Sequence, residues 1–254
     1  MSPPFCYNSN VRKVRGLRAT ADYVNLGKEV PYEWAFDLQK KLVGLRGAGK
    51  IPDTFLLLEH SKVITVGNNG KEANILLPEE ALRKQGYDLA RINRGGDVTY
   101  HGPGQLVGYF IFDIYSHGTG VREFFHKLEE IFIRLLSREY GLPAQREEEF
   151  PGVWVGEEKI TALGCAIKRG ISMHGFGFNV NTRLEDFQAI TPCGIQGRGV
   201  TSLEALLGEP QKMEEAREKL LEAIMEVFGI TLIPRERDQW LGEIEQWHKE
   251  SLNG

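Results

Sequence analysis

The stretch KITALGCAIKRGISMHGFGFNV, Lys159–Val180, contains two apolar runs joined by the dipeptide Arg169-Gly170. The runs Lys159–Lys168 and Ile171–Val180 are rich in β-branched and aromatic residues, and a two-residue connection that contains glycine is typical of a β-hairpin. Glycines alternate with aromatic residues in Gly175–Phe178, so one face of that strand carries no side chains. Such a bare face admits either a linear apolar ligand or the close packing of another element.

Periodic apolar residues on both sides of this hairpin predict a mixture of helices and strands. The strongest pattern is Val121–Tyr140, where an apolar stripe lies opposite a charged one and Gly141 follows the last residue. We expect further helices at Pro31–Arg46, Pro78–Gln85, Pro210–Phe228 and Pro234–Leu252, and further strands at Thr54–Glu59, Val63–Val66, Tyr87–Asn93, Leu106–Ile114 and Gly152–Val155. No repeat or linker divides the chain, so the sequence predicts one α+β domain over residues 1–254, with residues 1–20 as a flexible N-terminal arm.

Composition and charge exclude several classes of protein. The chain has 254 residues, with 31 basic and 35 acidic side chains and a net charge of −4, whereas a dedicated nucleic-acid binder is usually basic. Its apolar runs are far shorter than the about 20 residues that a membrane-spanning helix needs. No apolar segment follows the basic residues near the N-terminus, which excludes a secretory signal and leaves a transit peptide as the lesser alternative.

The cysteines and histidines predict a reduced protein without a metal site. Cys6, Cys165 and Cys193 form neither a disulfide framework nor a Cys-x-x-Cys motif. The six histidines show no close paired spacing, and a zinc site needs three or four ligands. We therefore expect a cytoplasmic protein in which each thiol is available for chemistry.

The segment Arg94–Gln105 reads RGGDVTYHGPGQ and lies between two expected strands. Its glycines require backbone that bends tightly or lies against a ligand. Two tight turns would explain the glycines alone, but Arg94, Thr99 and His101 add a cation, a hydroxyl and an imidazole to one short loop. In a phosphate-binding loop of the form Gly-x-x-x-x-Gly-Lys-Ser/Thr, a lysine follows the last glycine, and this segment has no such lysine. We therefore expect a different kind of ligand.

Cys193 differs from the other two cysteines in its surroundings. It lies between proline and glycine in the loop sequence ITPCGI, residues 190–195, unlike the usual buried structural thiol. Cys165 lies within a strand pattern and is expected in the core, and Cys6 lies in the polar arm. Lys159 is the first residue of a predicted strand, and taken alone it is most simply interpreted as a solvated charge at the sheet edge. His174, taken alone, is more often a structural histidine than a ligand.

Several ordered motifs together resemble the signature of the lipoyl(octanoyl) transferases, within the superfamily of biotin and lipoate transferases and ligases. The resemblance extends from about Tyr32 to Phe228, and it rests on Arg94-Gly95-Gly96, Thr99, His101-Gly102-Pro103-Gly104-Gln105, Tyr109, Lys159-Ile160, Ala162-Leu163-Gly164, His174-Gly175, Asn179-Val180, Pro192-Cys193-Gly194-Ile195 and Val200-Thr201-Ser202-Leu203. The chain departs from the family pattern at Ser61, Lys62, Asn68 and Phe110.

The resemblance implies a fold like that of biotin and lipoate protein ligases and an octanoyltransferase reaction without a cofactor. Cys193 is implied as the nucleophile that takes an octanoyl group from acyl carrier protein, and Lys159 as the residue that lowers the pKa of Cys193 and moves its proton. The implied acceptors are lysines of lipoyl domains and of glycine-cleavage H protein, and we expect a monomer that binds neither nucleic acid nor membrane. The implied substrate-binding residues are Arg94, Gly95, Gly96, Asp97, Val98, Thr99, Tyr100, His101, Ala162, Leu163, Gly164, Gly175, Phe176 and Gly177.

Elementary chemistry agrees with this pair of residues. A free thiol is only a few per cent ionised at neutral pH, whereas an ammonium about 4 Å away contributes about 4 kcal/mol at an effective dielectric constant near 20. Exchange between two thioesters is close to energy-neutral, and transfer onward to an amide is downhill, so no ATP is needed. The amides of Gly164 or of the Cys193-Gly194 turn are candidate donors to the oxyanion.

The expected acyl site lies along the strand that carries Phe176 and Phe178. Burial of an acyl chain there would stabilise binding by about 0.8 kcal/mol per methylene. Because carrier proteins are acidic, we also expect a basic rim, with Arg91, Lys168, Arg169 and Arg198 as candidates.

Three alternative functions remain at this point: an ATP-dependent lipoate or biotin ligase of the same fold, an octanoyl amidotransferase, and a non-catalytic acyl-binding module. A ligase needs no cysteine nucleophile, and nucleotide-binding signatures are missing from the sequence. An amidotransferase would be charged by an octanoylated carrier domain, and in a binding module Cys193 would be an ordinary loop thiol.

Overall fold

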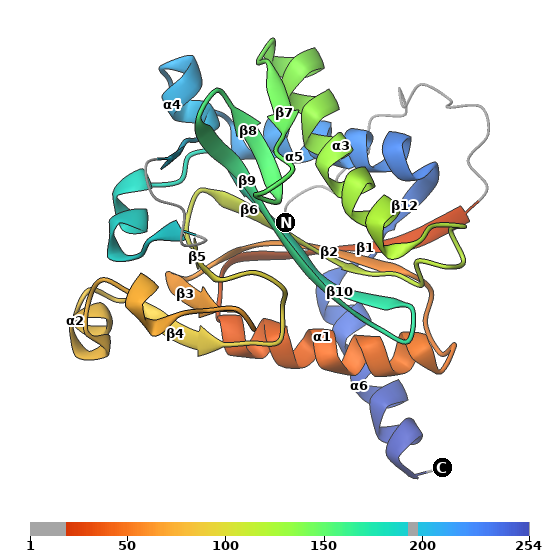
Figure 1. Ribbon diagram of the computed structural model, residues 1–254. Coiled ribbons are helices and arrows are strands. Elements are labelled where there is room, and N and C mark those ends of the chain that lie inside the picture. The colour runs from red at the N-terminus through yellow and green to blue at the C-terminus, as the bar shows by residue number, and fades with distance from the viewer. Residues whose placement is uncertain (1–18, 193–197, 254) are drawn as a thin grey trace, which may run out of the picture.

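The computed structural model describes residues 19–192 and 198–253, and a large mixed sheet runs through it (Figure 1). The order of its strands is β12 (Ile230–Pro234), β1 (Ala19–Val30), β2 (Thr54–His60), β6 (Gln105–Ile111), β10 (Ile171–Asn179), β9 (Glu158–Lys168), β8 (Gly152–Val155) and β7 (Ala144–Arg146). Strand β1 pairs in parallel with both of its neighbours, β12 and β2, and every later pair of neighbours in this order is antiparallel. The short β11 (Gly199–Val200) pairs with β9 outside this order.

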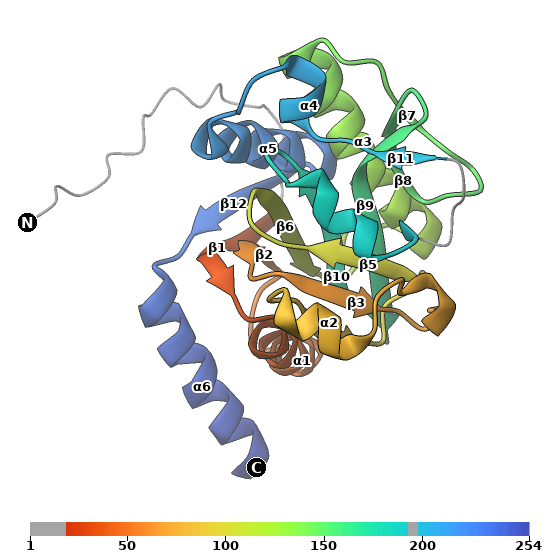
Figure 2. The ribbon, with the colours of Figure 1, turned by 90° about the vertical axis from the view of Figure 1, so that its left-hand side faces the viewer.

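Helices cover both faces of this sheet (Figures 1 and 2). One face carries α3 (Val121–Tyr140) and α5 (Met213–Phe228), whose apolar sides pack with the sheet around Phe110, Phe132 and Phe176. The other face carries α1 (Tyr32–Gly47) and α6 (Arg237–Asn253), which bury Leu42 and Trp240. This arrangement confirms the predicted α+β class of mixed sheets flanked by helices. No helix in residues 19–192 and 198–253 has the length and apolar character needed to cross a membrane.

A smaller sheet lies beside the large one, with the order β4 (Asp88–Arg91), β3 (Val63–Val66) and β5 (Val98–His101). Its core is shared with the 3-10 segment η2 (Leu184–Ala189), through Phe187 and Ala189. The remaining elements are short: η1 (Glu72–Asn74), α2 (Glu79–Lys84) and α4 (Leu203–Leu207). The small sheet therefore supports the segment that leads toward Cys193.

The predicted hairpin is confirmed. Strands β9 and β10 are antiparallel, and the pair nearest the turn is Lys168 with Ile171. The turn residues Arg169 and Gly170 both have positive φ, at 51° and 84°. Two successive positive φ angles fit the type I′ turn, whose twist matches that of the flanking strands. Gly175 is required by a close approach, because a Cβ at this position would lie 2.2 Å from the carbonyl oxygen of Gly108 on β6.

The structure contains five strands that the sequence analysis did not predict. Val98–His101 is strand β5 within the segment interpreted as a loop, and β1, β7, β11 and β12 are the other four. β1 has an irregular burial pattern and shifts in register at Gly27, so it lacks the alternation that identifies a strand locally. Ala19 and Thr20, assigned to the flexible arm, pair with Ile230 and Thr231, and the rest of that arm lies outside the described residues.

Candidate functional site

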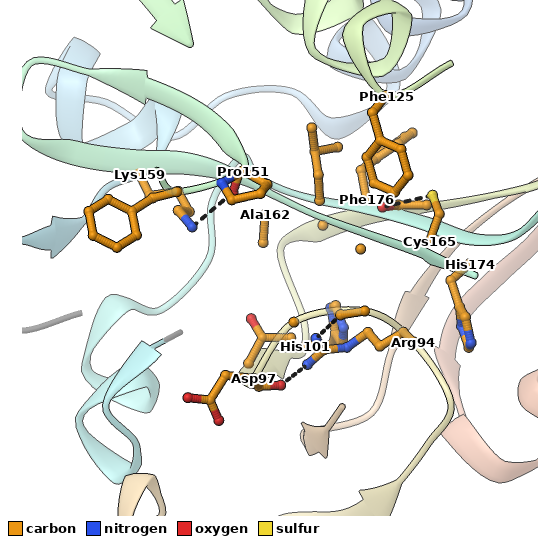
Figure 3. A pocket seen from close by; sticks show the side chains of 18 of the residues that line it. Arg94, Asp97, His101, Phe125, Pro151, Lys159, Ala162, Cys165, His174 and Phe176 are labelled. Carbon is orange, nitrogen blue, oxygen red and sulfur yellow. Dashed lines mark hydrogen bonds between the residues drawn. The ribbon is translucent and has the colours of Figure 1, made fainter. Parts of the chain in front are cut away.

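A cavity of about 490 Å³ lies where the Arg94–His101 segment faces strands β9 and β10 (Figure 3). One part of its wall is apolar and comes from Phe125, Leu163, Cys165 and Phe176. The rest is polar and aromatic. The sequence-predicted residues that line it are Arg94, Gly95, Gly96, Asp97, Thr99, His101, Lys159, Ala162, Leu163, Gly164, Gly175, Phe176 and Gly177.

Two of the predicted substrate-binding residues do not line this cavity. Val98 and Tyr100 alternate with Thr99 and His101 along β5, and side chains of successive strand residues point to opposite faces. Both are buried in the core of the small sheet. Phe178, expected beside the acyl chain, likewise packs against Phe132 of α3 within the main core, so only Phe176 of that pair reaches the cavity.

Arg94 organises the loop that it begins. Its guanidinium is buried and donates to both oxygens of Thr65 and to the carbonyl oxygens of Gly95, at 3.0 Å, and Asp97, at 2.8 Å. The loop lies so close to β9 that a Cβ at Gly164 would approach Arg94 Cδ and the Gly95 oxygen at 3.2 Å each. Glycine at position 164 therefore lets the loop close over the strand.

A hydrogen-bonded chain fixes the tautomer of His101. Nε2 of Gln105 donates to Oδ1 of Asn179 at 2.9 Å, so Oε1 of Gln105 is the acceptor for Nδ1–H of His101, at 2.6 Å. Nδ2 of Asn179 donates to the Thr201 carbonyl, and the Thr201 amide donates to the carbonyl of Lys159. Burial, with a contribution from nearby His60, lowers the pKa of His101 to about 3, so its imidazole is neutral at physiological pH.

Two more buried histidines lie near the site: His60 packs behind His101, and His174 lines the cavity. His60 donates from Nδ1 to the Val30 carbonyl and accepts from the Tyr109 hydroxyl at 2.6 Å, and burial lowers its pKa to about 4. His174 lines the cavity in a left-handed conformation, φ 64°, which is uncommon for a residue with a side chain. Burial and the charge of Arg94 lower its pKa to about 3, and its Nδ1 has no hydrogen-bond partner.

Lys159 is buried, with 5% of its surface exposed, so the simpler interpretation of a solvated edge charge is wrong. Its Nζ donates to the Pro151 carbonyl at 3.1 Å and lies 4.8 Å from the centroid of the Trp154 ring. A Cβ at Gly152 would lie 3.2 Å from the Cδ and Cε atoms of Lys159, so glycine there makes room for the lysine stem. Figure 3 shows Lys159 and Pro151 at one end of the cavity.

Cys193 lies outside the described residues, but both flanks of its segment are described. Before it, the Thr191 amide donates to the Asn74 carbonyl at 2.8 Å. After it, Val200 pairs with Lys159 itself through the β11–β9 ladder. The buried carboxylate of Asp186 accepts hydrogen bonds from Lys62, Tyr87 and Tyr100, which anchors η2 on the small sheet. Tyr100 therefore acts here as a support for that segment, and Lys62, a departure from the family pattern, takes part in it.

The candidate rim cations have different surroundings. Arg91 pairs with Glu72, and Arg198 lies near Glu147 and Glu157 while stacking over Trp154. Lys168 and Arg169 are exposed at the hairpin turn, away from the Lys159 end. Sequence reasoning missed Tyr32, Phe125, Phe150 and Pro151 in the cavity wall. These residues come from α1, α3 and a connection, and no local pattern links them to β9 and β10.

Comparison with known proteins identifies the family. The sequence model described as the lipoyl protein ligase A/B catalytic domain matches residues 31–225. An octanoyltransferase of Desulforamulus reducens is 52% identical over 200 residues, which cover 79% of this chain and 88% of the relative. The chain belongs to the octanoyltransferases. An octanoyltransferase of Caldicellulosiruptor saccharolyticus agrees, at 52% identity over 79% of this chain and 86% of the relative.

Solved structures support the fold of this octanoyltransferase family member. A lipoate-protein ligase A crystallised with ATP aligns with a TM-score of 0.70 over 91% of this chain and 94% of that one, at 18% identity. A bipartite lipoate protein ligase from Thermoplasma acidophilum aligns with a TM-score of 0.69 over 91% and 93%, at 17% identity. Sequence identity this low shows the fold alone. The predictions of an acyltransferase and of a ligase-like fold are both confirmed.

Proposed function

We propose that this octanoyltransferase takes an octanoyl group from acyl carrier protein onto Cys193 as a thioester. The group then passes to the ε-amine of a lysine on a lipoyl domain or on glycine-cleavage H protein. The observation that carries the proposal is the cavity itself: about 490 Å³, apolar along Leu163 and Phe176, with the buried amine of Lys159 at one end. A medium-length acyl chain with a reactive carbonyl at Lys159 fits that arrangement.

The flanks of the Cys193 segment support a role for Lys159 beside the thiol. Val200 is the ladder partner of Lys159, and Arg198 stacks over the same Trp154 ring at 5.0 Å. The chain that leaves the Cys193 segment is therefore held next to Lys159. Pairing of Cys193 with Lys159 stays a proposal, because residues 193–197 lie outside the described residues.

The reaction balances with these two groups alone. The Cys193 thiolate attacks the octanoyl carbonyl, and the carrier thiolate leaves with a proton from the Lys159 ammonium. The acceptor amine then attacks the acyl-cysteine, and neutral Lys159 takes its proton as the Cys193 thiolate leaves. An ammonium beside the thiol stabilises the thiolate, which is the reactive form.

The polar part of the cavity has a separate task. His101 and His174 are neutral, and the buried guanidinium of Arg94 is already engaged with Thr65, Gly95 and Asp97. These groups shape and hold the loop, and the two histidines do not readily accept a proton at physiological pH. We assign proton transfer to Lys159 alone.

The donor, the acceptors and the monomeric, cytoplasmic state belong to the same proposal. A lipoyl-domain acceptor is supported by the solved relative from Thermoplasma acidophilum, whose description names its E2 lipoyl domain. The two acceptor types can be compared directly by offering a lipoyl domain and an H protein in one reaction and quantifying octanoylation of each.

Intact-mass spectrometry after incubation with octanoyl-carrier protein tests the function. We expect one octanoyl adduct on the wild-type protein and on Cys6→Ala, and none on Cys193→Ala. An adduct that persists in Cys193→Ala would refute the assignment of the nucleophile. No adduct on the wild type would indicate a binding module, an adduct formed only from an octanoylated H protein would indicate an amidotransferase, and an adenylate formed from lipoic acid and ATP would indicate a ligase.

A further inference from the structure

A second cavity of about 440 Å³ lies next to the first, on the side of the β9–β10 turn. Both cavities are bordered by Phe125 of α3 and Cys165 of β9. In Figure 3, Phe125 projects from α3 toward the two strands, beside Phe176 and Cys165. The far end of the acyl cavity is therefore closed by two side chains, with further space behind them lined by Tyr115, Val121, Ile167 and Arg169.

The length of the first cavity along β9 matches an eight-carbon chain. The stem of Lys159 runs toward Gly152, which pairs with Ala162, so the amine lies near the level of Ala162. From Ala162 to Cys165 is three strand residues, or about 10 Å. An extended eight-carbon chain measures roughly 9 Å from carbonyl carbon to methyl carbon. An octanoyl group that starts beside Lys159 therefore ends at Phe125 and Cys165.

Cys165 is suited to form an apolar wall. Its side chain is buried in the main core, and burial raises the pKa of its thiol to about 12. The thiol is therefore neutral and does not compete as a nucleophile. Phe125 is only partly buried and packs at the edge of the same core, so its ring is the more easily displaced of the two.

The second cavity is apolar on its solvent side as well. Tyr115 and Val121 are 63% and 45% exposed, although they are large apolar residues. The Tyr115 ring lies against the turn, where a Cβ on Gly170 would be 2.7 Å from it. Arg169 is the only charged residue among those described in this lining. The space can thus cover additional methylenes of a chain that passes Phe125.

We infer that Phe125, together with Cys165, is the specificity-determining element that ends the acyl site at eight carbons. The second cavity is a subsite for the carbons beyond the eighth, which Phe125 keeps separate from the first. The ligand class is a saturated acyl chain of ten to twelve carbons. This inference rests on the proposed function, because the acyl carbonyl must lie beside Lys159.

A competition assay tests the role of Phe125. Equal amounts of octanoyl- and dodecanoyl-carrier protein are offered with a lipoyl domain, and both products are quantified by mass spectrometry. Phe125→Ala should raise the dodecanoyl-to-octanoyl product ratio about tenfold or more. Dodecanoyl has four more methylenes than octanoyl, and a tenfold change is smaller than the largest change that their burial could cause. Ile133→Ala on the same helix is the matched control, since Ile133 is a partly buried core residue that borders neither cavity, and its ratio should equal that of the wild type.

Two further variants keep the test decisive if Phe125→Ala is unstable. Phe125→Leu keeps a buried apolar side chain and should show a smaller increase in the ratio. Adding Ile167→Phe to Phe125→Leu fills the second cavity and should remove that increase. A folded Phe125 variant with an unchanged ratio would overturn the inference.

Direct binding separates this inference from the proposed function. Dodecanoate binding, measured by calorimetry, should tighten in Phe125→Ala even if no transfer is detected. If the wild type transfers no octanoyl group, the proposed function fails, and a change in binding then shows only that Phe125 separates the two cavities. If the wild type transfers octanoyl and neither the ratio nor the binding changes, the inference fails alone.

Discussion

The ammonium of Lys159 lies 4.8 Å from the centroid of the Trp154 ring, and the guanidinium of Arg198 lies 5.0 Å from the same ring. One aromatic side chain of β8 thus contacts a cation on β9 and a cation that directly follows the Cys193 segment. Cation–π contacts of this kind contribute roughly 0.5–2 kcal/mol each. Trp154 therefore helps to hold the lysine and the end of the cysteine segment at one place.

Lys159→Met should lower the rate of acylation by octanoyl-carrier protein at least 100-fold, within the range of about 10²–10⁴ for general acid–base catalysis. Methionine retains an unbranched stem for the buried channel beside Gly152, which alanine would leave empty. The rate is measured by quenched-flow mass spectrometry, and folding by circular dichroism. Lys50→Met, at an exposed lysine that does not line the cavity, should acylate normally. A Lys159→Met enzyme that acylates at the wild-type rate would exclude the lysine from proton transfer.

Arg94→Lys should reduce kcat/KM for the octanoyl donor at least tenfold. Lysine keeps the charge but cannot reach Thr65, Gly95 and Asp97 at once, and each lost hydrogen bond to a charged group costs about 1.5–3 kcal/mol. Steady-state kinetics measure the effect, and Arg91→Lys at an exposed ion pair is the control. Equal kinetics for the two variants would show that the guanidinium geometry does not matter.

Asp186→Asn should lower the free energy of unfolding by roughly 1–3 kcal/mol and also slow acylation. Asparagine replaces one acceptor oxygen with an NH₂ group, so at least one of the donors Lys62, Tyr87 and Tyr100 loses its hydrogen bond, and η2 leads toward Cys193. Urea denaturation and the acylation rate are measured together, with exposed Asp88→Asn as the control. Loss of stability with full activity would limit Asp186 to a structural role.

Acidification should destabilise the protein between pH 6.5 and about 4. The pKa values of His60, His101 and His174 are lowered from 6.5 to about 4, 3 and 3, chiefly by burial. In this window the unfolded chain binds more protons than the folded one, so the free energy of unfolding falls as the pH falls. Thermal melts from pH 7.5 to 4.5 should show a decreasing Tm, with a shallower slope in His60→Gln. A Tm independent of pH over this range would contradict the burial of neutral histidines.

Local patterns predicted much of the fold. The α3 helix has the predicted bounds, Val121–Tyr140, and the β9–β10 hairpin turns at the predicted dipeptide. Both elements are defined by contacts between residues close in sequence, which periodicity and turn chemistry report directly. β12 was missed because its partner in the sheet, β1, is more than 200 residues away, and β1 was missed because its burial pattern is irregular.

The candidate site shows the same division. The glycine-rich loop and the bare stretch of β10 could be named from the residues, since glycines within apolar runs are conspicuous. Lys159 was named only through the family resemblance, because a charge at the start of a strand is usually solvated. The sequence could not show that the side chains of Val98 and Tyr100 point away from the cavity. Their segment was interpreted as a loop, and only a strand has side chains that alternate between two faces. Nor could the sequence show that Phe125 borders the cavity, since an apolar residue at this position is equally expected in the buried stripe of the helix.

By itself, the sequence determined the long helices and the hairpin, because those depend on residue type and short spacing, and its motifs proposed Cys193 and Lys159 for acyl chemistry. Only the tertiary structure decided that Lys159 is buried against Trp154 and that Phe125 separates two cavities. Burial and cavity walls arise where elements distant in the chain pack together, and such packing depends on the whole set of contacts at once.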